Sequence, residues 1–181
     1  IIEGLVAPWE FKKAAENTLS KRLQHALERL RDGLHDEAER EKIRQILAEA
    51  RDFCYHLDLA PSLRLLQEIL LEQLILLQEE FCGAHSDDMQ DVVEYVHAAR
   101  IEEINDFLDF INSLPLELNR TASQNILFRI LMEKLPALRQ RADSSNGKAR
   151  ELVESLCLLA EKLDFSTDCV AFQEKTGGQY S

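Results

Sequence analysis

The chain has 181 residues, of which 45% are hydrophobic and 30% charged, and its formal net charge is −12. This composition excludes a fully disordered chain and predicts one with a sizeable core. The acidic balance argues against partners that are nucleic acids or anionic membranes, because both attract a surplus of Lys and Arg.

The first predicted helix follows Pro8 and carries apolar residues at helical spacing as far as Gly33, which is a typical stop signal. It is either one helix or two short helices that meet near residues 17–20. The second helix has the clearest apolar stripe and is expected to end near residues 58–60. Its stripe consists of Ile43, Ile46, Leu47, Ala50, Phe53, Cys54 and Leu57.

The third helix is predicted to open at Pro61, to end at Gly83 and to carry a wide apolar face. That face belongs either to a central helix contacted on several sides or to a surface that binds a partner. Ser86 with the two following Asp residues predicts the cap of a fourth helix, which stops at Pro115.

A fifth helix is predicted to begin with Thr121 or Ser123 as its cap, and Pro136 is expected to kink or restart it. A sixth follows the polar turn at residues 143–147. No segment has the pattern of a strand. We therefore predict an all-α bundle of about six antiparallel-packed helices, with a single domain over residues 1–170 and a frayed tail at 171–181.

The four cysteines form no CxxC pair, and Cys54 and Cys157 fall in the apolar phase of helical patterns. We expect both to be buried, small, apolar side chains with free thiols. A leucine-rich domain of this size needs no disulfide, so the cysteines favour a reducing, cytoplasmic location.

Two spacings could hold a metal, but each is incomplete. Glu94 and His97 form an E-x-x-H pair, although a di-metal bundle needs a second such pair, which the chain lacks. Cys82 and His85 supply half of a zinc site. We interpret the first pair as part of a solvated helix face and the second as a helix C-terminus with incidental side chains, and we predict no catalytic residue, metal or cofactor. The single tryptophan, Trp9, is interpreted either as a packing cap or as an anchor for a partner.

Three stretches resemble the C-terminal helical region of bacterial proteins related to glycoside hydrolase family 57. They are EFKKAAENTLSKRLQHAL (10–27), REKIRQILAEARDFCYHLDLAPSLRLLQEIL (40–70) and LPLELNRTASQNILFRIL (114–131). The third stretch carries the family's pattern at Leu114, Pro115, Glu117, Asn119, Gln124 and Asn125. It departs from the pattern at Thr121, where the family has Trp, and this departure puts the retention of a family surface in doubt.

The resemblance implies a noncatalytic accessory domain, cut from a longer parent, that packs on a catalytic barrel and shapes one side of an α-glucan cleft. It makes Asn119, Gln124 and Asn125 candidates for an interdomain contact, although turn chemistry also explains them as a helix corner. Two alternatives remain open at this stage. One is a stand-alone helical adaptor, and the other is a metal-dependent enzyme built around Glu94 and His97.

Overall fold

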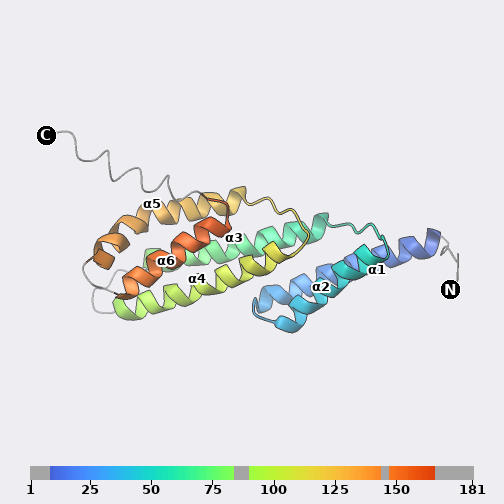
Figure 1. Ribbon diagram of the computed structural model, residues 1–181, viewed down its shortest axis with the longest axis horizontal. Coiled ribbons are helices and arrows are strands. Elements are labelled where there is room, and N and C mark those ends of the chain that lie inside the picture. Colours follow the sequence, from blue (N-terminus) through green and yellow to red (C-terminus); the bar gives the residue numbers. More distant parts are fainter. Residues whose placement is uncertain (1–8, 84–89, 144–146, 166–181) are drawn as a thin grey trace. The chain divides into compact units, whose positions relative to one another are not determined.

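The computed structural model describes residues 9–83, 90–143 and 147–165, and all its regular structure is helical (Figure 1). Six helices and no strand occur in these residues, which confirms the predicted all-α helical fold. The helices are α1 (Trp9–Asp32), α2 (Glu37–Asp52), α3 (Ala60–Gly83), α4 (Gln90–Ser113), α5 (Thr121–Asp143) and α6 (Gly147–Lys162).

The described residues cluster into two compact units, which are considered separately below. Unit 1 contains α1, α2, α3 as far as Glu68, and residues 113–118. Unit 2 contains the rest of α3, most of α4, and all of α5 and α6. The single domain over 1–170 stays a prediction, because two contact units can belong to one domain. The proposed frayed tail at 171–181 lies outside the described residues.

Unit 1 is built on an antiparallel hairpin of α1 and α2 (Figure 1). α1 is a single continuous helix, and the alternative of two short helices is wrong. It ends just before Gly33, as predicted, and a short turn leads into α2. The apolar stripes of the two helices face one another, and Leu23, Leu27, Leu30 and Ile43 are completely buried. Burial of these stripes is the main stabilisation of the hairpin.

α2 ends at Asp52, earlier than predicted, in a Schellman cap. The Tyr55 N–H donates to Ala50 O at 2.8 Å and the Cys54 N–H to Arg51 O at 3.2 Å. Cys54 occupies the left-handed position of this cap with φ 53°. As a result Phe53 is 65% exposed and Cys54 is exposed, so the prediction that both continue the buried stripe is wrong. The described cysteines, Cys54, Cys82 and Cys157, are free thiols, as expected, although Cys157 is only half-buried.

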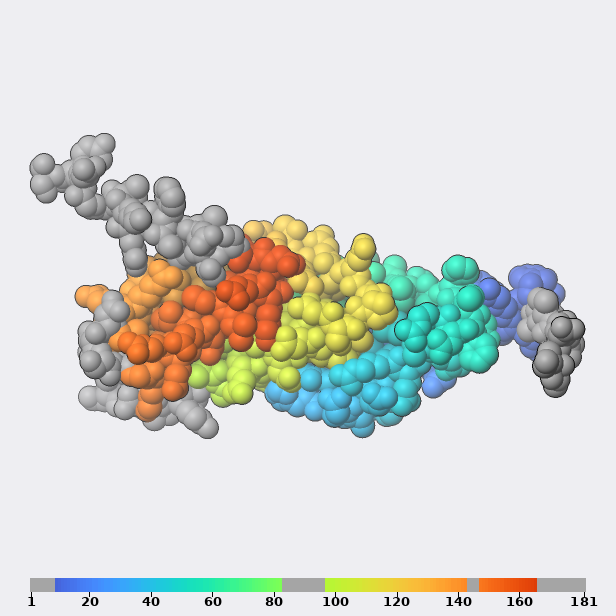
Figure 2. Space-filling model, viewed as in Figure 1, coloured from blue at the N-terminus to red at the C-terminus, as the bar shows by residue number. Residues whose placement is uncertain are grey.

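In unit 2, α4, α5 and α6 form one continuous packed surface (Figure 2). Phe107 of α4 and Leu127, Leu131 and Leu156 of α5 and α6 are completely buried there. Polar contacts also join α4 to α6. Lys162 Nζ donates to Asp109 at 2.7 Å and to the backbone oxygen of Asn105 at 3.2 Å.

Two further sequence predictions concern α5 and α3. α5 remains helical through Pro136, so it does not restart there. The part of α3 in unit 2 is apolar on several sides, and most of this width is buried. Its buried residues include Ile69, Leu70, Leu74 and Leu77, whereas Ile75 and Leu76 are 37% and 42% exposed.

Candidate functional site

Asn119 and Asn125, two of the predicted contact residues, have different surroundings at the start of α5. The side-chain oxygen of Asn119 accepts the Thr121 N–H at 3.0 Å and thereby satisfies one orphan donor of the helix. Because Thr121 is the first helical residue and Ser123 is buried within the helix, the prediction that one of them is the cap is wrong. Asn125 is exposed.

Gln124, the third predicted contact residue, binds the C-terminus of α6 instead. Its Nε2 donates to Leu163 O at 2.7 Å. Arg120, which the sequence reasoning missed, donates to Lys162 O at 3.0 Å and to Asp164 at 2.8 Å, and its other nitrogen reaches Asn112 at 2.6 Å. These bonds satisfy carbonyls that the end of α6 leaves without helical partners.

The end of α6 is itself a Schellman cap, and its geometry explains why it needs these partners. Asp164 takes the left-handed position with φ 58°, and the Phe165 N–H donates to Ala160 O at 2.9 Å. Asn119 and Gln124 therefore have structural partners within unit 2. Asn119 and Asn125 are both exposed, and Gln124 is half-buried.

In the described part of the chain, neither of the two candidate metal sites has a cluster of ligand side chains. No group of three His, Cys, Asp or Glu side chains gathers there closely enough to hold an ion. His97 is buried with its ring 4.1 Å from that of Phe81, so its interpretation as a solvated residue is wrong. Cys82 is exposed. The side chain of Glu94, and the whole of His85, lie outside the described residues.

In unit 1, two side chains of α1 hold the segment that follows α2. Glu16 is only 6% exposed, and its carboxylate accepts the His56 N–H at 2.9 Å. Ser20 Oγ accepts the Asp58 N–H at 3.0 Å. The hydrogen bond from the His56 backbone keeps the pKa of Glu16 below its ordinary value, against the opposing effect of burial. A polar hollow of about 220 Å³ lies beside this segment, between α1 and the start of α3.

A second hollow, of about 190 Å³, opens on the surface between α1 and α2. Arg22, His25, Ala26, Arg29, Glu39, Lys42 and Ile46 line it. Glu39 is 6% exposed and accepts from Lys42 at 2.6 Å and, more weakly, from Arg29 at 3.4 Å. The Lys42 bond, with a smaller contribution from Arg29, holds the pKa of Glu39 below its ordinary value.

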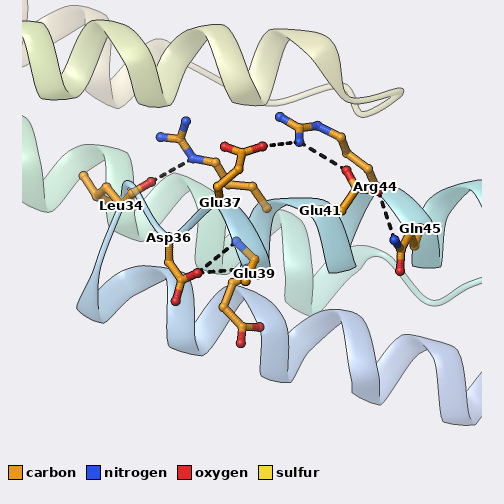
Figure 3. A network of polar contacts seen from close by, with 9 residues as sticks. Leu34, Asp36, Glu37, Glu39, Glu41, Arg44 and Gln45 are labelled. Atoms are coloured by element: carbon orange, nitrogen blue, oxygen red, sulfur yellow. Dashed lines mark hydrogen bonds and ion pairs between the residues drawn. The ribbon is translucent and has the colours of Figure 1, made fainter.

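The first turns of α2 carry a local polar network that positions Glu39 (Figure 3). Asp36 is the N-cap, and its carboxylate accepts the backbone N–H groups of Ala38 and Glu39 at 3.0 and 3.2 Å. Arg44 binds Glu37 at 2.6 Å and Glu41 at 3.5 Å, and the Glu37 bond raises the Arg44 pKa. Because these ion pairs are solvent-exposed, they contribute little stability.

Large aromatic side chains are exposed at the open end of the hairpin, opposite its turn. Trp9 and Phe11 belong to the first turn of α1 and are 73% and 69% exposed. Phe53 follows the last residue of α2 and stacks on Tyr55 with ring centroids 5.7 Å apart. The Glu16–His56 bond places the segment after α2 beside the N-terminal half of α1. Trp9 is therefore not the packing cap that the sequence allowed.

The sequence did not predict that Phe53 is exposed, because its spacing continues the apolar stripe of α2. None of the described helices combines the length and apolar character needed to cross a membrane. Comparisons of the chain with family models, with curated proteins and with solved structures found no match.

Proposed function

We propose that the chain is a noncatalytic helical interaction module that binds a partner through the open end of the α1–α2 hairpin. The exposure of Trp9, Phe11 and Phe53 carries this proposal. Large aromatic side chains dominate binding energy at protein interfaces, and three of them are exposed on this hairpin.

The resemblance to family 57-related proteins supplies one identity for the partner, a catalytic barrel of the same parent. In that case Asn125, exposed on α5, belongs to a second contact. A separate protein is the other identity for the partner. An assay for α-glucan hydrolysis tests the noncatalytic part of the proposal, and turnover by this chain alone would overturn it.

Dye binding and light scattering test the aromatic surface directly. We expect the native chain to enhance the fluorescence of an apolar dye, and we expect Phe11→Ser with Phe53→Ser to abolish most of the enhancement. Both positions are exposed, so far-ultraviolet circular dichroism should show an unchanged helical signal. A monomer that binds no dye would count against the proposal, and so would equal dye binding by the double variant.

A further inference from the structure

We draw no further inference here: the strongest candidate, the exposed face that Trp9, Glu10, Lys13 and Ala14 form on the first turns of α1, carries none because nothing in the described residues shows what covers it.

Discussion

Removing the side-chain bonds of Asn119 and Gln124 should destabilise unit 2, because both residues satisfy backbone groups at helix ends. Asn119→Ala removes the acceptor of the Thr121 N–H, which costs about 1 kcal/mol for a typical helix cap. Gln124→Ala removes the donor to Leu163 O, a neutral hydrogen bond worth about 1 kcal/mol. The two bonds share no partner, so the double variant should lose about 2 kcal/mol.

For a chain of this size, a loss of that magnitude lowers the melting temperature by roughly 4–8 °C. Thermal unfolding followed by circular dichroism at 222 nm measures it. Asn125→Ala is the matched control, because its exposed side chain should change stability by less than about 0.5 kcal/mol. If Asn119→Ala with Gln124→Ala melted at the same temperature as Asn125→Ala, our assignment of these residues to helix ends would be refuted.

Three further predictions concern unit 1 and the core. Glu16 and Glu39 have lowered pKa values in the folded chain, so their contribution to stability is present above their ordinary pKa of about 4.5 and is lost as pH falls through the lower folded values. In urea titrations between pH 6 and 3, Glu16→Gln with Glu39→Gln should reduce this loss of stability. An unchanged dependence of stability on pH would contradict the lowered pKa values of the two carboxyl groups. Cys54→Gly should stabilise the chain by about 1 kcal/mol in urea unfolding, because Gly adopts the left-handed φ of the cap without a steric penalty, and a loss of stability would speak against the cap. Phe107→Ala should cost about 3–5 kcal/mol, since the side chain is completely buried, and a cost below 1 kcal/mol would show that it is not a core residue.

Periodicity predicted the helices well but could not locate every end. Gly33 and Pro61 are strong signals, and α1 and α3 respect them. The end of α2 was missed because Cys54 occupies a position where Gly is usual, and because the spacing of Phe53 continues the apolar stripe. A Schellman cap without Gly depends on local hydrogen bonds that a hydrophobic pattern does not encode.

The polar residues at the start of α5 show a similar limit. Their types indicated a helix corner, and Asn119 confirms that interpretation. The partners of Gln124 and Arg120, however, are residues 162–164, about forty positions further along the chain. Such contacts follow from tertiary packing. For the same reason the sequence could not show that the basic residues of α1 and Lys42 of α2 surround Glu39.

The most direct test of the central claim compares the native chain with the Phe11→Ser, Phe53→Ser double variant in their binding of an apolar dye. The proposed interaction surface predicts that the native chain enhances the fluorescence of the dye and that the double variant loses most of this enhancement. No enhancement by the native chain, or equal enhancement by the two proteins, would contradict the claim.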